Sequence, residues 1–350
     1  MPKVALVQFA PHSPSTSHPA DSSSPSSNFS LNLSKAHQFV RQAAKQGAEL
    51  ICFPEYFLSG VVADKPHWTL SQYPSTHSHL HDDHPNVSDS PPSTTTHWLT
   101  TFQSLAKELE VDIAVGTIVE RQIDPKTGLE VKVKVKIEGE EKEEEEERMV
   151  LNNVAYYVGS DGEIKGRYVK RNLWWPEKEY LTSSESDDEH KVFETRFGRT
   201  SFLICWDLAH GSSFLPLLSQ SVDLIICPTY WTNSDGGPQA KRWDQDSEKK
   251  WLESLIVSRA FENECGIIFV NVGASKDGEN EEERIGCSAV CLPFKGKIGG
   301  TSSEKEEMVV IDMDLEVLKD ARAVYGMRRG LMIKREEEEE QKKKRNQQEK

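Results

Sequence analysis

Three side chains that could together carry out acyl transfer follow apolar segments of this 350-residue chain. Cys205 ends the run TSFLIC, Glu55 follows ELICFP, and Lys170 follows EIKGRYV. A thiol with a pKa of about 8.5 is mostly protonated at neutral pH, so a cysteine nucleophile needs a carboxylate to take its proton or a cation to favour its thiolate. Glu55 and Lys170 supply such a base and such a cation.

Each of these residues also has an ordinary structural interpretation. A cysteine in an apolar strand is usually packing material, Glu55 could be a carboxylate at a helix start, and Lys170 could be a solvated amine. Their shared position favours chemistry, because the carboxyl ends of strands in an open α/β sheet form the crevice in which ligands bind. The sequence therefore predicts a site at the ends of three strands.

The pattern of hydrophobic residues indicates an α/β protein. Strand-like runs alternate with helical patterns over 33–47 and 252–264. Some runs are apolar on both faces, whereas 152–158 and 163–169 form a hairpin-like pair, so mixed sheets are expected. We expect two packed sheets flanked by helices. The strand-like runs are 3–9, 48–53, 111–119, 152–158, 163–169, 200–205, 222–227, 266–272, 287–292 and 307–313.

Three segments resemble, in chain order, the signature blocks of the nitrilase superfamily of carbon-nitrogen hydrolases. They are FPEYFLSG, YVKRNLWWPEKEYL and ICWDLAHG. The resemblance continues through the later strands to the closing segment MVVIDMDLEVLKDARAVYGMRR. It implies an αββα sandwich and a Glu-Lys-Cys triad of Glu55, Lys170 and Cys205. It also implies a second carboxylate beyond the lysine, for which Glu177 matches best, to position the substrate amine and the lytic water.

The chemistry of amide attack adds further expectations. The oxyanion formed on attack needs hydrogen-bond donors, each worth about 3–4 kcal/mol, and the candidates are Lys170 and the backbone N–H of Trp206. Aromatic residues beside the signature blocks are expected to contact the substrate. These residues are Tyr56, Trp174, Trp175, Trp206, Tyr230 and Trp231.

The segment after Cys205 bears on the substrate. Asp207 in Cys-Trp-Asp resembles amidases and N-carbamoyl amidohydrolases, so a small linear amide or carbamoyl amide is expected, with a small nitrile as the alternative. Ala209 to Ser212 depart from the family pattern and put any transfer of substrate preference in doubt. A catalytically silent binding or scaffold protein is another alternative. A papain-like hydrolase would need a histidine partner such as His210.

The domain is expected to cover residues 1–333, with polar surface insertions near 12–28, 71–96 and 136–148 and a charged, disordered tail over 334–350. The second insertion contains a histidine-rich run in a Ser/Pro-rich context that offers metal ligands no rigid support, so no metal or cofactor is expected. The run holds His77, His79, His81, Asp83 and His84.

Composition limits the partners. A formal net charge of −15 disfavours nucleic acid and anionic membranes, since both need a basic face. There is no signal-peptide pattern and no run of about 18 apolar residues, and the six cysteines form no CxxC pair. These features predict a soluble cytoplasmic protein. The family resemblance implies a homodimer formed through the helices that follow the strands ending at Cys205 and Cys227.

Overall fold

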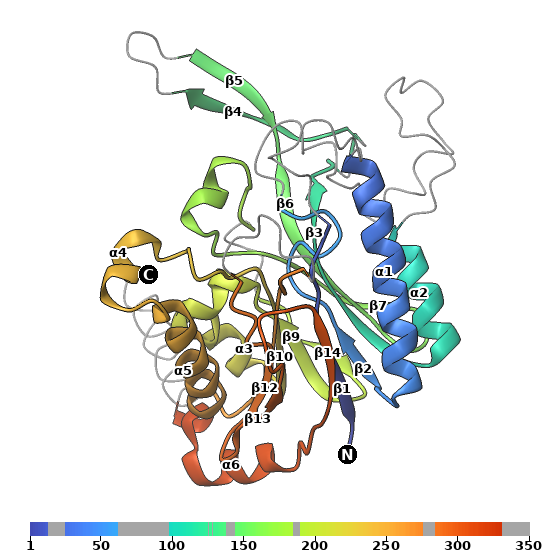
Figure 1. The fold of residues 1–350 in the computed structure, drawn as a ribbon, viewed down its shortest axis with the longest axis vertical. Coiled ribbons are helices and arrows are strands. Elements are labelled where there is room, and N and C mark those ends of the chain that lie inside the picture. Colours follow the sequence, from blue (N-terminus) through green and yellow to red (C-terminus); the bar gives the residue numbers. More distant parts are fainter. Residues whose placement is uncertain are drawn as a thin grey trace, which may run out of the picture.

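The computed structural model describes residues 1–12, 25–61, 98–124, 126–127, 129–137, 144–184, 190–275 and 284–330. Its two large sheets each have parallel strands at the centre and antiparallel strands outside them (Figure 1). The first sheet runs in the order β14 (Glu307–Asp312), β1 (Lys3–Gln8), β2 (Leu50–Cys52), β3 (Asp112–Arg121), β6 (Leu151–Val158) and β7 (Ile164–Val169). The second runs in the order β13 (Gly296–Gly300), β12 (Ala289–Leu292), β11 (Gly266–Asn271), β10 (Leu224–Thr229), β9 (Gly198–Phe202) and β8 (Phe193–Thr195).

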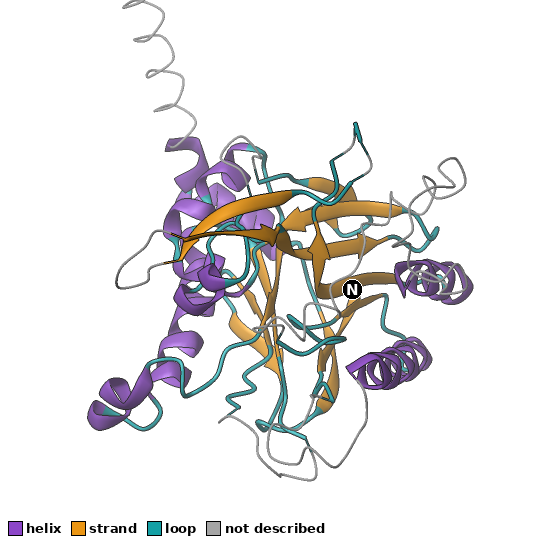
Figure 2. Cartoon of the chain, turned by 90° about the horizontal axis from the view of Figure 1, so that it is seen from above, coloured by secondary structure: helices purple, strands orange, loops and turns teal. Residues whose placement is uncertain are grey.

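The two sheets lie face to face between two groups of helices (Figure 2). The predicted αββα sandwich with two mixed sheets is therefore confirmed. The helices are α1 (Pro25–Lys45), α2 (Trp98–Leu109), α3 (Leu215–Ser219), α4 (Gly237–Trp243), α5 (Ser247–Glu262) and α6 (Val317–Tyr325), and the 3-10 helices are η3 (Trp175–Glu179), η4 (Cys205–Ala209) and η5 (Gly211–Ser213). In the described part of the chain, none of the helices is long and apolar enough to cross a membrane.

The period of two along each strand assigns its side chains to two different cores. In β1, Val4 and Leu6 pack in the core between the sheets, while Ala5 and Val7 pack against the layer of α1 and α2. Both faces of the strand are buried, which explains why it is apolar without alternation. On the outer face of the second sheet, α5 packs against β11 and β12. The side chains that it buries there recur every four residues, at Leu252, Ile256 and Ala260.

The charged segment near 136–148, predicted as a polar surface insertion, overlaps a regular hairpin. The hairpin consists of β4 (Lys132–Ile137) and β5 (Glu144–Met149) and projects from the body of the molecule (Figure 1). The pairing places Lys134 opposite Glu147, and opposite charges across a strand pair are favourable. Cross-strand pairing of opposite charges thus allows a regular structure in a segment of high charge density.

The other predicted insertions overlap the described residues only in part. Helix α1 begins at Pro25, inside the insertion predicted for 12–28, and Asn28 is buried. Residues 71–96, with the histidine-rich run, and the tail over 334–350 lie outside the described residues. The domain limits of 1–333 and 334–350 stay predictions.

The loop that carries Glu55 rests on a glycine in β3. Gly116 has a φ of +64° where the pairing of β3 with β6 shifts register. A β-carbon there would collide with the carbonyl oxygen of Pro54 and lie 2.9 Å from Cδ1 of Phe57. The absence of a side chain therefore allows the loop after β2 to lie directly against β3.

We expect Gly116→Ala to destabilise the protein by about 2–4 kcal/mol, because it adds a steric collision to the strain of a left-handed residue. Gly326→Ala is the matched control, since Gly326 has a φ of +61° and a β-carbon added there would have nothing within 4 Å. The control should lose only about 1–2 kcal/mol. Urea unfolding measures both changes. Equal losses in the two variants would contradict the assigned contact.

Candidate active site

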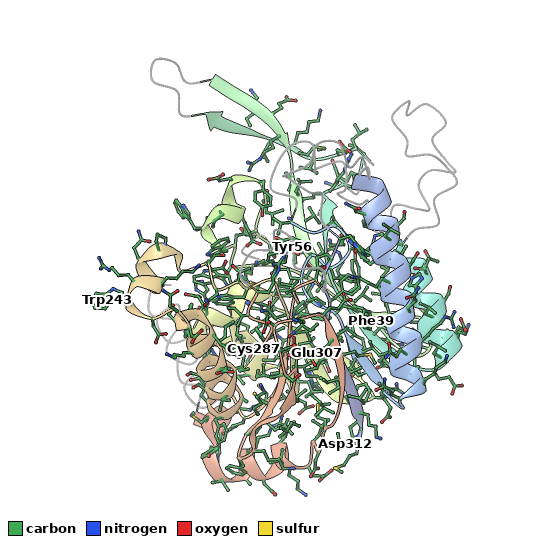
Figure 3. The ribbon with its side chains drawn as sticks, in the orientation of Figure 1. Phe39, Tyr56, Trp243, Cys287, Glu307 and Asp312 are labelled. Carbon is green, nitrogen blue, oxygen red and sulfur yellow. The ribbon has the colours of Figure 1, made fainter. Side chains whose placement is uncertain are left out.

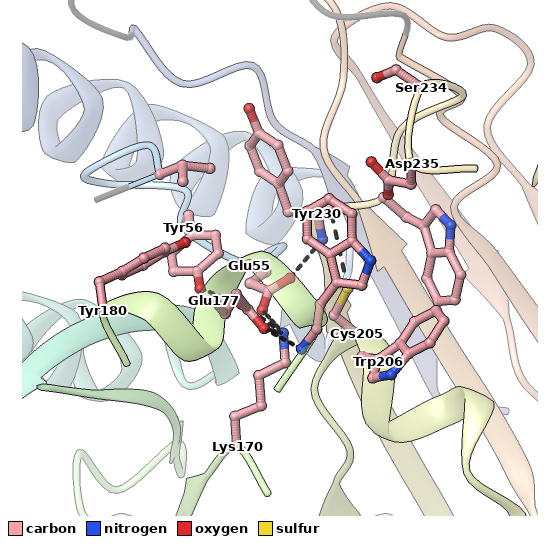
Figure 4. A pocket seen from close by; sticks show the side chains of 13 residues that line it. Glu55, Tyr56, Lys170, Glu177, Tyr180, Cys205, Trp206, Tyr230, Ser234 and Asp235 are labelled. Atoms are coloured by element: carbon pink, nitrogen blue, oxygen red, sulfur yellow. Dashed lines mark hydrogen bonds and ion pairs between the residues drawn. The ribbon is translucent and has the colours of Figure 1, made fainter. Parts of the chain in front are cut away.

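The predicted nucleophile, base and cation converge in one cavity of about 180 Å³ (Figure 4). Glu55 follows β2, Lys170 follows β7, and Cys205 follows β9, so strand ends of both sheets contribute to it. Glu177 reaches the same cavity from η3. The lining residues are Glu55, Tyr56, Val61, Lys170, Trp174, Glu177, Tyr180, Cys205, Trp206, Tyr230, Trp231, Ser234 and Asp235.

The carboxylate of Glu55 is buried and fully engaged by donors. Its Oε1 accepts hydrogen bonds from Nζ of Lys170 at 2.8 Å and from Nδ2 of Asn153 at 2.7 Å. Its Oε2 accepts the backbone N–H of Tyr230 at 2.8 Å. Tyr230 follows β10 in the second sheet, so this one side chain connects the two sheets at the site.

The ammonium of Lys170 is held between two carboxylates. Only 1% of its side chain is exposed, and Nζ lies 2.8 Å from Oε1 of Glu55 and 2.7 Å from Oε2 of Glu177. Burial alone would lower the pKa of this amine, but the two carboxylates raise it well above its ordinary value. Lys170 is therefore charged at neutral pH.

Glu177 is itself oriented by its neighbours. The hydroxyl of Tyr56 donates to its Oε1, and the backbone N–H of Trp174 donates to its Oε2 at 2.8 Å. Burial and the adjacent charge of Glu177 raise the pKa of Tyr56 well above its ordinary value, so the phenol remains a donor. Tyr56 and the backbone of Trp174 thus hold the second predicted carboxylate against the ammonium of Lys170.

Cys205 opens η4 with a φ of +46°, in the left-handed region that non-glycine residues rarely occupy. Its Sγ lies 3.8 Å from the carbonyl oxygen of Tyr230. Burial and the charge of Glu55 raise the pKa of the thiol, and Lys170 only partly opposes them. The raised pKa favours the protonated thiol of Cys205 over its thiolate at neutral pH.

Glu55 has the pKa of a base that works at neutral pH. Burial is the main cause that raises the pKa of its carboxyl to about 7, with Lys170 lowering it and Glu177 raising it. A general base is most effective when its pKa lies near the working pH. The arrangement can thus accept a proton from a neighbouring thiol near neutrality.

The chain matches the model of the carbon-nitrogen hydrolase family over residues 3–323. It belongs to the carbon-nitrogen hydrolase family. A probable nitrilase of Schizosaccharomyces pombe is 27% identical, over 50% of this chain and 58% of that protein. The N-carbamoylputrescine amidase of Arabidopsis thaliana is 22% identical, over 87% of this chain and 88% of that protein.

Solved structures of the nitrilase superfamily share the fold of this carbon-nitrogen hydrolase. Nit3 of Saccharomyces cerevisiae has a TM-score of 0.62 at 20% identity, covering 93% of this chain and 94% of its own. A mutant amidase from Nesterenkonia sp. AN1, with acrylamide added at its active-site cysteine, has a TM-score of 0.58 at 18% identity, covering 92% and 97%. At these identities the likeness establishes the fold.

Most of the aromatic residues that we expected to contact the substrate are found in the lining of the cavity. Tyr56, Trp174, Trp206, Tyr230 and Trp231 are among its lining residues. The expectation for Trp175 is wrong, because its side chain is outside the lining and 76% exposed. Trp174 precedes η3 with an extended backbone and Trp175 is the first residue of η3, so the two adjacent side chains point in different directions.

The sequence missed several residues of the site. Four residues that the sequence did not identify as functional also line the cavity, namely Val61, Tyr180, Ser234 and Asp235. Asn153 contacts Glu55 from the interior of β6. The only sequence signal for its role was an asparagine pair in a strand-like run. A buried amide of this kind requires a hydrogen-bond partner.

His210 does not take the place that a papain-like mechanism would require. It lines a neighbouring cavity that shares Trp206, and it is absent from the described lining around Cys205. The histidine-rich run of the second insertion lies outside the described residues. Among the described residues, no group of three or more His, Cys, Asp or Glu side chains could hold a metal ion.

We expect the alkylation of Cys205 by iodoacetamide to accelerate as pH rises through about 7, because Glu55, with its pKa of about 7, accepts the thiol proton only when it is ionised. In Glu55→Gln the acceleration should move to the higher pH at which the buried thiol ionises by itself. Peptide mass spectrometry after timed quenching measures the rate. An unchanged profile in Glu55→Gln would contradict this role.

Proposed function

We propose that the chain hydrolyses a small linear amide or carbamoyl amide through a thioester on Cys205. The observation that carries this proposal is the unbroken buried network from Glu55 through Lys170 to Glu177 in the cavity that also contains the thiol. Two of the similar proteins, the Arabidopsis amidase and the Nesterenkonia amidase, support an amide as substrate. The latter also supports a cysteine as the reacting group.

The first half of the proposed reaction forms the thioester. Glu55 takes the proton of Cys205 as Sγ attacks the carbonyl carbon, whose π electrons move to oxygen. Nζ of Lys170 lies within 2.8 Å of one oxygen of Glu55 and of both oxygens of Glu177. In this step its positive charge stabilises the oxyanion, together with the backbone N–H of Trp206. The oxyanion then collapses, the C–N bond breaks, and the leaving nitrogen takes the proton from Glu55.

The second half releases the acid. A water molecule gives a proton to Glu55 and attacks the thioester carbon, with Glu177 helping to position it. Collapse of the second oxyanion breaks the C–S bond, and sulfur recovers the proton from Glu55. All protons and electron pairs are returned, so the chemistry is balanced by side chains alone.

The cavity limits the size of the substrate. About 180 Å³ between aromatic walls suits a short acyl group, with the remainder of the substrate extending to solvent. Asp207, which indicated an amide in the sequence, is buried and not among the lining residues. A small nitrile therefore remains the second candidate, supported by the probable nitrilase of Schizosaccharomyces pombe among the similar proteins.

We expect mixing with a turned-over amide, followed by an acid quench, to leave the acyl mass on the peptide that contains Cys205. A panel of small amides, carbamoyl amides and nitriles, with ammonia release as the signal, identifies the substrate. The buried thiols of Cys227 and Cys265 are internal controls that should stay unmodified. Cys205→Ala should abolish turnover. Turnover by Cys205→Ala, or a panel without any hydrolysis, would contradict the proposal.

We also propose a homodimer formed through α3, α4 and α5, the helices that follow β9 and β10. Apolar side chains are exposed there, with Trp243 82%, Leu215 51% and Trp251 39% accessible. Trp243 projects outward from α4 (Figure 3). A cytoplasmic location is proposed as well, because the six cysteines are all free thiols.

Light scattering should give a mass near twice 39.6 kDa. We expect Trp243→Asp to weaken the dimer, because a carboxylate would be buried in an apolar interface. Val324→Asp is the control, since Val324 is an exposed apolar residue of α6, outside the proposed interface. A monomeric wild-type chain at micromolar concentration would contradict the dimer.

A further inference from the structure

Asp207 has a buried carboxylate that the proposed reaction does not use. It lies two residues after Cys205 in η4, is 0% exposed, and is absent from the described lining of the cavity. Its Oδ1 accepts hydrogen bonds from the backbone N–H of Asn172 at 2.7 Å and from Nδ2 of Asn172 at 2.8 Å. Its Oδ2 accepts the hydroxyl of Tyr168 at 2.8 Å and the backbone N–H of Ile204 at 3.0 Å.

These donors flank the two groups that have to meet in the reaction. Tyr168 and Asn172 lie two residues before and two residues after Lys170, at the end of β7 in the first sheet. Ile204 immediately precedes Cys205, after β9 in the second sheet. One carboxylate therefore connects the segment that carries the amine to the turn that carries the thiol.

We propose that Asp207 is a positioning residue that holds Sγ of Cys205 in register with Nζ of Lys170. The inference rests on the proposed function, because it assumes that these two groups act together. The bond to the N–H of Ile204 closes the turn in which Cys205 has its φ of +46°, a conformation that needs support from its surroundings. Without that support, Sγ of Cys205 would no longer be held in the position from which it attacks the bound substrate.

The position requires a carboxylate. All four contacts come from donors, namely two backbone N–H groups, an amide N–H and a hydroxyl. An ionised carboxylate accepts all four, whereas an asparagine would present its own N–H groups to at least one donor. Burial, with the charge of Asp207 as a second cause, raises the pKa of Tyr168 well above its ordinary value, so its hydroxyl stays a donor.

Asp112 offers a matched control. It is also buried, at 3% exposure, and accepts the hydroxyl of Tyr157 at 2.7 Å and the backbone N–H of Ser160 at 2.9 Å. It begins β3, so it lies at the amino ends of the parallel strands, the opposite edge from the site. Asp112 also pairs with Nε of Arg196 at 3.2 Å, a contact that Asp207 lacks. Asp112→Asn and Asp207→Asn each perturb a buried aspartate that accepts a tyrosine hydroxyl and a backbone N–H, but only the second disturbs the turn of Cys205.

The test compares iodoacetamide alkylation of Cys205 in folded wild-type protein and in the two variants, together with kcat and KM for a turned-over amide. We expect Asp207→Asn to lower the alkylation rate and kcat by about tenfold or more with KM within about twofold, because a misplaced nucleophile affects the reaction more than binding. Asp112→Asn should keep both rates within about twofold of wild type. Wild-type rates in Asp207→Asn, or equal losses in both variants, would overturn the proposal.

A second pair of variants decides the question if Asp207→Asn does not fold. Tyr168→Phe and Tyr157→Phe each remove one hydroxyl from a buried aspartate. Only Tyr168→Phe should slow alkylation, and equal rates in the pair would overturn the proposal. Because alkylation requires no amide turnover, this comparison stays valid even if Cys205→Ala still hydrolyses amides, the result that would refute the proposed function.

Discussion

The burial of the Lys170 ammonium is the constraint on which the site depends. Removing an ammonium from water costs several kcal/mol, and the cost is offset only when opposite charges and hydrogen bonds replace the lost water. Glu55 and Glu177 provide that replacement within 2.8 Å, and donors from Asn153, Tyr56 and two backbone N–H groups satisfy the carboxylates in turn. Removing Lys170 would leave both buried carboxylates without a compensating charge.

This requirement explains why the site is built from strand ends and short turns of both sheets. The three charges come from the loop after β2, the end of β7 and η3, and the first of these segments is more than 100 residues from the other two. Side chains on long flexible loops would not hold such a cluster, because each ion needs partners at fixed distances. The backbone packs closely around the carboxylate of Glu55. Gly116 leaves no room for a side chain beneath its loop, and the N–H of Tyr230 reaches it from the second sheet.

The sandwich and the convergence of the charged residues could be predicted from the sequence because both follow from periodicity and strand ends. The orientation of single side chains could not. Trp174 and Trp175 are equivalent in the sequence, and only the direction of η3 decides that Trp174 faces the cavity. Asp207 lies two residues after Cys205, yet its carboxylate accepts the hydroxyl of Tyr168 and does not line the cavity. The sequence indicates a polar surface insertion near 136–148 but not the hairpin of β4 and β5, because the register that places opposite charges across the two strands is not visible in the residue types alone.

The charge balance of the cluster also accounts for the protonated thiol. A thiolate of Cys205 beside the ionised carboxylate of Glu55 would place a second negative charge in a buried space. Keeping the proton on sulfur avoids that cost, in agreement with the raised pKa of Cys205. In the proposed reaction a single negative charge then moves from Glu55 to the sulfur as it attacks and on to the oxyanion beside Lys170. The net charge of the buried site stays constant through the step, so a base with a pKa of about 7 suffices to activate a thiol that would otherwise be inert.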